Sequence, residues 1–174
     1  MRKANVLPVL GVLASLLSMS AGQAWAQAGE ANVRLRGYEE VPALTTGGGA
    51  VFHATLEPDA ISYEMSYNGA FRGKVLQSHI HFAQRGVNGG IVVFLCTNLG
   101  NGPAGTQACP NAPASITGTI HASDITGAPS QGLVAGDLAA LERAIRAGIA
   151  YVNIHSDVFP GGEIRGQLVF TPSP

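Results

Sequence analysis

The feature that most constrains the fold of this chain is a series of short segments in which apolar and polar residues alternate. In the first of them, 31–37, Val33 and Leu35 point to one side of an extended chain, and Arg34 and Arg36 point to the other. Comparable segments, each ended by glycine, proline, asparagine or aspartate, follow at 49–57, 60–69, 74–83, 89–97, 114–123, 150–157 and 162–171. Many short strands between such turn residues predict an all-β sandwich or barrel.

One segment, 136–148, breaks this pattern. Leu138, Leu141 and Ile145 recur there at the spacing of an α-helix. Gly148 follows the last of them, and glycine commonly ends a helix. We therefore expect one short helix, packed over one end of the sandwich.

Residues 1–26 have the parts of a secretory signal peptide. Arg2 and Lys3 give a positive start, an apolar run follows, and an Ala-x-Ala site ends at Ala26. The apolar run is shorter than the roughly 20 residues that a membrane-spanning helix needs. We expect cleavage after Ala26, a periplasmic or secreted location, and no membrane span after cleavage.

Residues 27–174 are predicted to form a single domain. Loss of Arg2 and Lys3 from a chain of net charge −1 leaves a net charge of −3 and no cluster of basic side chains. This balance argues against nucleic acid as a partner. The domain also has no serine nucleophile elbow and no glycine-rich loop between a strand and a helix, which argues against serine hydrolysis and phosphate binding.

Two cysteines, Cys96 and Cys109, flank a loop rich in glycine, proline and asparagine. In an exported protein such a pair most often forms a disulfide. Closing a loop of this length stabilises a fold by about 3 kcal/mol. A thiolate metal site is the alternative, but the pair lacks Cys-x-x-Cys spacing. We expect a structural disulfide.

The strongest chemical signal is the pair of histidines in "SHIHF", His79 and His81. Side chains alternate across a strand, so Ser78, Ile80 and Phe82 point to one face while both histidines point to the opposite face. Two of the five histidines of the chain thus share one side of one strand.

Two later segments divide in the same way. The residues that share one face are Tyr151, Asn153, His155 and Asp157 in the first, and Glu163, Arg165 and Gln167 in the second. If the opposite, apolar faces form the core, His155 joins the histidine pair on one outer face, with Glu163 and Arg165 close by. The alternation predicts the face on which each side chain lies, but it does not predict which strands are neighbours in the sheet.

Three stretches together resemble the CHRD domain, a module named for its repeats in chordin and also found alone in exported bacterial proteins. They are "LRGYEEVPALTTGGGAVF", "HIHFAQRGVNGGIVVFL" and "AGIAYVNIHSDVFPGGEIRGQL", within a resemblance that runs from about Val33 to Leu168. The resemblance implies a β-sandwich module and no established reaction. The residues on its signature positions are His79, His81, His155, Glu163 and Arg165. We expect an immunoglobulin-like or Cu,Zn superoxide dismutase-like antiparallel β-sandwich with one short helix.

Convergence of His79, His81 and His155 would give a three-histidine metal site with an open coordination position. Imidazole suits copper and zinc, and Cu(II) binds a given site more tightly than zinc does. Copper is therefore the expected ion, with zinc as the alternative. The His-x-His pair is also similar to the copper ligands of Cu,Zn superoxide dismutase, as a likeness of architecture only.

Three more residues are expected around these histidines. Asp157 or Glu163 can orient an imidazole, and Arg165 can hold that carboxylate or attract an anion. In the alternative interpretation the histidines, Glu163 and Arg165 form a polar network that only holds the strands in register. The chain would then be an extracellular module that binds a protein or matrix partner.

A third hypothesis is a metal-dependent redox enzyme resembling superoxide dismutase. Against it, the chain offers no evident fourth histidine for copper and no loop rich in histidine and aspartate for a companion zinc. His53 and His121 are interpreted as ordinary strand histidines exposed on their sheets. Glu39 and Glu40 point apart on an extended chain, so we expect solvated loop charges, one of them near an arginine of the preceding strand.

Overall fold

The computed structural model describes residues 28–173, which form one antiparallel sheet of nine strands and one α-helix. The strands are β1 (Gly29–Arg36), β2 (Gly49–Glu57), β3 (Ala60–Tyr67), β4 (Val75–Phe82), β5 (Gly90–Thr97), β6 (Ala114–Ile120), β7 (Ala150–Ser156), β8 (Ile164–Gln167) and β9 (Val169–Pro172). Helix α1 is Leu138–Arg146, and the 3-10 helices are η1 (Gly37–Glu39), η2 (Ala122–Asp124) and η3 (Pro129–Gln131). The expected all-β antiparallel class is confirmed. The expected signal peptide, 1–26, lies outside the described residues.

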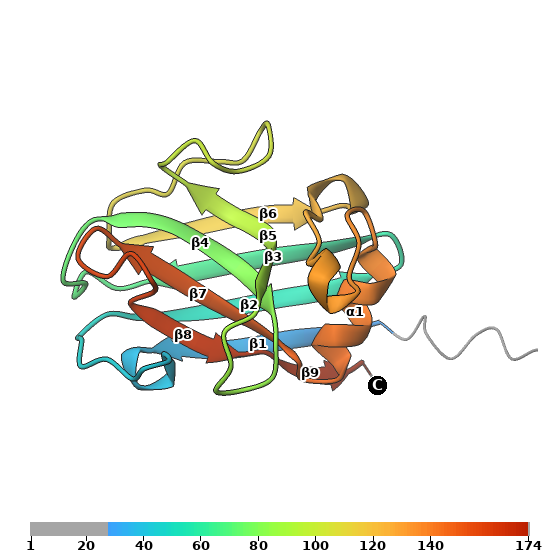
Figure 1. Ribbon diagram of the computed structural model, residues 1–174, viewed down its shortest axis with the longest axis horizontal. Coiled ribbons are helices and arrows are strands. Elements are labelled where there is room, and N and C mark those ends of the chain that lie inside the picture. The colour runs from blue at the N-terminus through green and yellow to red at the C-terminus, as the bar shows by residue number, and fades with distance from the viewer. Residues whose placement is uncertain (1–27, 174) are drawn as a thin grey trace, which may run out of the picture.

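The sheet curls until its two halves face each other. The strand order is β5-β4-β7-β8-β1-β2-β3-β6, with β9 paired to β1, and Figure 1 shows β4, β7 and β8 in front of β2 and β3. Phe52 and Met65 from one half and Ile80 and Ile154 from the other are fully buried, and they fill the space between the halves. Burial of such apolar surface is the main favourable contribution to folding.

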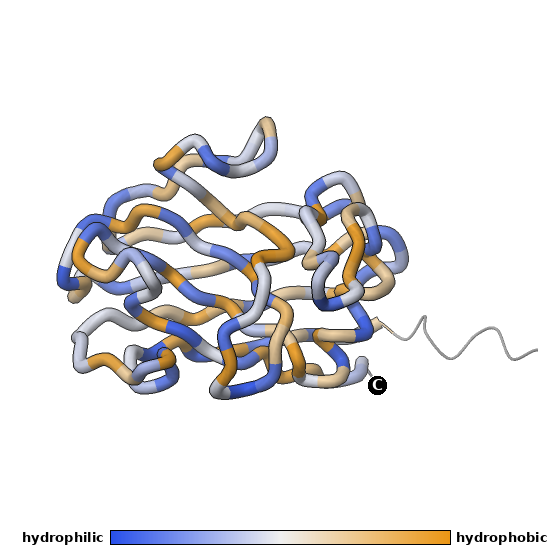
Figure 2. The backbone as a smooth tube through the Cα atoms, viewed as in Figure 1, coloured by the Kyte–Doolittle hydropathy of each residue, from blue (hydrophilic) through white to orange (hydrophobic). Residues whose placement is uncertain are grey.

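The two halves differ in what covers their outer faces. Strand β1 alternates between buried and exposed residues, as a sheet with one solvated face should, and Figure 2 shows the matching alternation of polar and apolar residues. Every residue of β7 and β8 is buried. Alternation still holds in these two strands, so their polar side chains point outward and are covered by something other than the sheet.

Loops provide that cover. The Gln167 side chain donates a hydrogen bond of 2.9 Å to the carbonyl of Ala83, in the loop between β4 and β5. In the loop between β7 and β8, the carbonyl of Pro160 forms a hydrogen bond with the His155 ring. In the loop between β3 and β4, the amide of Arg72 donates a hydrogen bond to the Glu163 carboxylate. The expected outer polar face therefore exists, but it is buried.

Helix α1 lies near β9 at one end of the sheet and confirms the predicted helical stripe. Leu141 and Ile145 are buried and Leu138 is half-buried. The side chain of Asp137 caps the first turn by accepting from the Ala140 amide at 2.8 Å. Gly148, with φ of 68°, follows the helix in the left-handed conformation expected for its C-terminal end.

Cys96 and Cys109 form the expected disulfide. Two strand boundaries differ from the sequence-based prediction. The segment 162–171 forms two strands, β8 and β9, separated at the buried Leu168. Strand β6 ends at Ile120, and His121 is the N-cap of η2, because the Asp124 carboxylate accepts a hydrogen bond from the His121 amide and stabilises a turn there.

None of the helices within residues 28–173 is long and apolar enough to cross a lipid bilayer.

Glu39 and Glu40 were both expected to be solvated loop charges, and this prediction was wrong for Glu40. Glu39 is a surface residue that pairs with Arg85 of the loop between β4 and β5. Glu40 is only 8% exposed because it lies against Gly162 under the covering loops. Burial raises the pKa of Glu40 to about 7, against the opposing effects of the Arg165 charge and a backbone hydrogen bond.

Replacement of Glu40 by glutamine should change how stability depends on pH. The folded chain keeps a proton on Glu40 that the unfolded chain loses, so the free energy of unfolding contains a component that falls as pH rises from 4.5 to about 7. Glu40→Gln removes this component and should stabilise the fold by on the order of 2 kcal/mol at about pH 8, with little effect at about pH 5. Urea unfolding of both proteins at the two pH values measures the difference. An equal difference at both pH values would contradict the assignment.

Candidate metal centre

Strands β4 and β7 lie side by side and carry three histidines on one outer face. The register pairs His79 with Asn153 and His81 with Tyr151, and His155 lies two residues beyond Asn153 on β7. Their exposed fractions are 0% for His79 and 7% for both His81 and His155. The sequence predicted their common facing, and the pairing of β4 with β7 brings them together.

The histidine rings converge closely enough to hold one ion. Nδ1 of His79 lies 3.2 Å from Nε2 of His155. One nitrogen from each of His79, His81 and His155 can be chosen so that all three lie within 4.8 Å of one another. Bonds from imidazole nitrogen to a transition metal are about 2 Å long, so the ligand atoms of one ion lie within about 4 Å of one another, close to the spacing of these three nitrogens.

Main-chain carbonyls fix the orientation of two of the rings. Nδ1 of His155 lies 2.9 Å from the carbonyl oxygen of Pro160, and Nδ1 of His81 lies 3.0 Å from that of Gly89. A carbonyl oxygen only accepts hydrogen bonds, so both Nδ1 atoms carry a proton. In neutral rings the two Nε2 atoms then present lone pairs, which is the form that binds a metal.

All three rings are held in the neutral form. Burial lowers the pKa of His79 to about 2, and repulsion by charge on the neighbouring histidines lowers it further. Burial also lowers the pKa of His81 to about 4 and that of His155, in each case outweighing the hydrogen bond to the carbonyl. Metal binding at these nitrogens would therefore require little proton release at neutral pH.

His79 has an unsatisfied nitrogen. Its Nδ1 lies within hydrogen-bond distance of His155, but its buried Nε2 has no hydrogen-bond partner among the described residues. The edge of the ring faces Phe94, with centroids 4.5 Å apart. Buried polar atoms in folded proteins are nearly always paired, so this nitrogen is an exception. Because the two nitrogens of an imidazole point in different directions, Nε2 lies outside the contact that Nδ1 makes with His155.

A stack of three side chains supports His81 from the side. The ring of Tyr151 is parallel to that of His81, with centroids 4.6 Å apart, and the guanidinium of Arg165 lies 3.5 Å from the Tyr151 centroid. Both cannot occupy the same face of the tyrosine, so Tyr151 is sandwiched between them. Arg165 donates to the carbonyl of Val87 and, at 2.8 Å, to the side chain of Asn88, and so holds the loop that positions His81.

The carboxylates that were expected to orient the histidines form hydrogen bonds with other groups. Glu163 is fully buried and accepts hydrogen bonds from Thr46 and, at 2.8 Å, from the amide of Arg72. Asp157 is exposed and accepts from the amide of Lys74 at 2.9 Å. Among the described residues neither side chain bonds to a histidine, and loop carbonyls occupy Nδ1 of His81 and His155 instead. Glu163 instead fastens the covering loops to the sheet.

Sequence reasoning missed four groups at this site. Gly89 and Pro160 act through their main chains, which no side-chain pattern reveals. Tyr151 and Asn153 were placed on the correct face by alternation, and that was the only available signal for them. Asn153 is 3% exposed, and its Oδ1 lies 3.0 Å from Nε2 of His81.

The other two histidines lie apart from this cluster. His53 is half-buried on β2, and its Nδ1 lies 2.6 Å from the side chain of Asn32. His121 is exposed at the start of η2, so it is a capping residue instead of the expected strand residue. Neither belongs to the histidine group that could hold an ion.

Comparison with known proteins identifies the family. The family model of the CHRD domain matches residues 31–168, which covers most of the chain, and every side chain of the histidine cluster falls within the match. No curated protein and no solved structure matches the chain. The chain belongs to the CHRD domain family.

Proposed function

We propose that this chain binds one divalent transition-metal ion through His79, His81 and His155. The observation that carries the proposal is the convergence of three buried imidazoles, one nitrogen from each lying within 4.8 Å of the others. A bound cation would use the lone pairs that the two loop carbonyls leave free on His81 and His155.

Copper is the ion that the ligand set favours, with zinc as the alternative. Imidazole nitrogen suits both ions, and a given nitrogen site binds Cu(II) more tightly than Zn(II). The group contains no thiolate, since both cysteines are in the disulfide. This composition disfavours ions that require soft sulfur ligands.

We place this activity outside the cytoplasm, in the periplasm or the medium. The disulfide supports this location, because such bonds persist mainly in oxidising compartments. Membership of the CHRD family, whose domain is of an extracellular type, supports it independently. A protein there would meet metal ions that the cytoplasm keeps tightly bound.

Loss of one histidine should abolish tight metal binding. The untagged domain is expected to bind close to one Cu(II) or Zn(II) per chain, and His81→Ala and His155→Ala should each weaken binding by more than about 100-fold, because each removes a direct ligand. Competition titration with a chromophoric chelator measures the affinities. His53→Ala is the matched control, since it removes a histidine of the same domain outside the cluster. Equal weak binding in all four proteins would refute the metal site.

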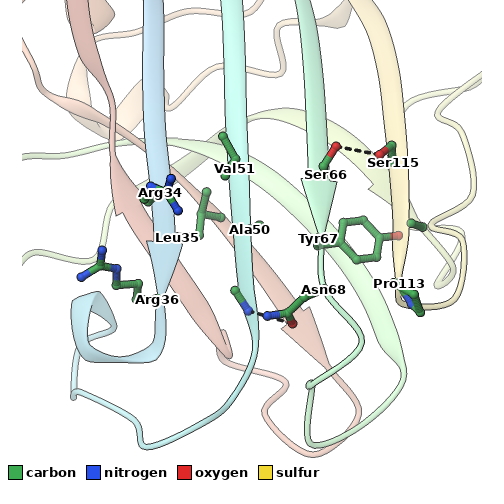
Figure 3. A pocket seen from close by; sticks show the side chains of 12 residues that line it. Arg34, Leu35, Arg36, Ala50, Val51, Ser66, Tyr67, Asn68, Pro113 and Ser115 are labelled. Carbon is green, nitrogen blue, oxygen red and sulfur yellow. Dashed lines mark hydrogen bonds between the residues drawn. The ribbon is translucent and has the colours of Figure 1, made fainter.

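A second candidate function comes from the opposite side of the molecule. A shallow hollow of about 630 Å³ lies on the exposed face of β1, β2, β3 and β6, and Figure 3 shows the side chains around it. The register places Arg34, Val51, Ser66 and Ser115 in one row across the four strands. Two residues further along, Gly49 is paired with Arg36, and the Asn68 side chain accepts a hydrogen bond from the Gly49 amide there.

The charge of this hollow selects an acidic partner. The side chains of Arg34 and Arg36 are exposed, and neither forms an ion pair or hydrogen bond with another described residue. They start from the same side of β1, two residues apart along the strand. No carboxylate lines the hollow, whereas Ser66 and Ser115 line its other side with hydroxyl groups. These groups suit an acidic matrix polysaccharide, which offers both negative groups and hydroxyls.

Charge reversal should test this surface. The double variant Arg34→Glu, Arg36→Glu is expected to lose retention on an immobilised sulfated polysaccharide, and retention of the wild type should fall as salt is added. Arg143→Glu, on the exposed side of α1, is the matched control and should be retained like the wild type. Unchanged retention of the double variant, or equal retention on a neutral polysaccharide, would exclude this surface as the binding site.

A further inference from the structure

Asn153 lies in the middle of the three histidines. It is paired directly with His79 across β4 and β7, and it is two residues from His155 on the same face of β7. Its side chain reaches diagonally to His81, where Oδ1 lies 3.0 Å from Nε2. The residue is 3% exposed, so its amide has little water to bind.

The side-chain amide of Asn153 faces Nε2 of His81. His81 uses its Nδ1 proton for the carbonyl of Gly89, so Nε2 of the neutral ring carries a lone pair. The Asn153 amide can turn either of its groups toward this lone pair. Its nitrogen donates a hydrogen bond to Nε2 in the metal-free chain, and its oxygen can join Nε2 on a shared metal ion.

The spacing of these atoms fits ligands of one ion. In a tetrahedral site with bonds of about 2.0–2.1 Å, neighbouring ligand atoms are about 3.3 Å apart. The separation between Asn153 and His81 is 3.0 Å, and that between His79 and His155 is 3.2 Å. Both pairs are therefore close to the separation of ligands that share a metal.

We propose that the side-chain oxygen of Asn153 is the fourth ligand, giving a site of three imidazole nitrogens and one amide oxygen. This inference rests on the proposed function, because it assigns a further ligand to the same ion. An uncharged oxygen ligand favours Cu(II) and Zn(II) over Cu(I), which prefers soft ligands. Asn153 thereby makes the site selective for divalent ions and fills the position that three histidines leave open.

Affinity measurements on Asn153→Ala and Asn153→Asp test the assignment. Asn153→Ala should still bind one ion, but with an affinity for Zn(II) and Cu(II) lowered by about 10- to 100-fold, while its affinity for Cu(I) stays within about twofold. Asn153→Asp supplies an anionic oxygen in the same place and should bind Zn(II) more tightly than Asn153→Ala does. Asn32→Ala is the matched control, since Asn32 makes a similar contact with His53 outside the cluster.

A spectroscopic measurement separates a ligand from a structural neighbour. The electron paramagnetic resonance spectrum of the Cu(II) protein should change its copper hyperfine splitting in Asn153→Ala and not in Asn32→Ala. Thermal melting of the metal-free variants shows whether each is folded. If Asn153→Ala does not fold, the comparison of Asn153→Asp with the wild type still tests the assignment.

Two results would overturn the inference, and they can be told apart. If the wild type binds metal and Asn153→Ala binds Cu(II) and Zn(II) equally or more tightly with an unchanged spectrum, the amide merely donates to His81 in the metal-free chain and is displaced on binding. If the wild type binds neither Cu(II) nor Zn(II), the proposed function fails together with this inference.

Discussion

The constraint on which the rest of the structure depends is that β7 and β8 are buried on both faces, although one of those faces is polar. A polar side chain removed from water must find a partner, or the fold loses stability. Each polar group on the outer face of these strands therefore needs a hydrogen-bond partner in the loops above it. The hydrogen bonds made by Gln167 and Arg165 to the loop between β4 and β5, and by Glu163 to the loop between β3 and β4, meet this need.

The loops and the histidines consequently form one unit. The carbonyl of Gly89 orients His81, and the amide of Gly89 donates to the hydroxyl of Tyr151, whose ring stacks on the same histidine. Arg165 holds this loop from the other side of Tyr151. A ring that is fixed by packing, stacking and a carbonyl has little freedom to turn away from an ion. Such preorganisation is what gives a small set of ligands high affinity.

Much of this arrangement follows from the sequence, and the missing parts have a common cause. Alternation assigned His79, His81, His155 and Asn153 to their correct faces, because the two-residue period of a strand is local. It did not show that β4 lies beside β7, since strand order is set by long-range contacts. The burial of Glu40 and the carbonyls above the histidines were also beyond prediction, because loop conformation over a sheet depends on the whole fold. The mistaken expectation for Glu40 arose from treating a loop residue as solvated.

The depth of the cluster bears on what a bound ion would do. His79 has no exposed surface, and the other two histidines are 7% exposed, so an ion at this site would be almost enclosed by the loops. A redox enzyme needs a coordination position that substrate reaches repeatedly, and an amide oxygen from Asn153 would fill that position. Entry and release of the ion would require the loops to open, and such motions are slower than side-chain rotation. An ion bound in the proposed way, with slow exchange and a filled coordination sphere, would suit storage or protection better than the turnover of a substrate.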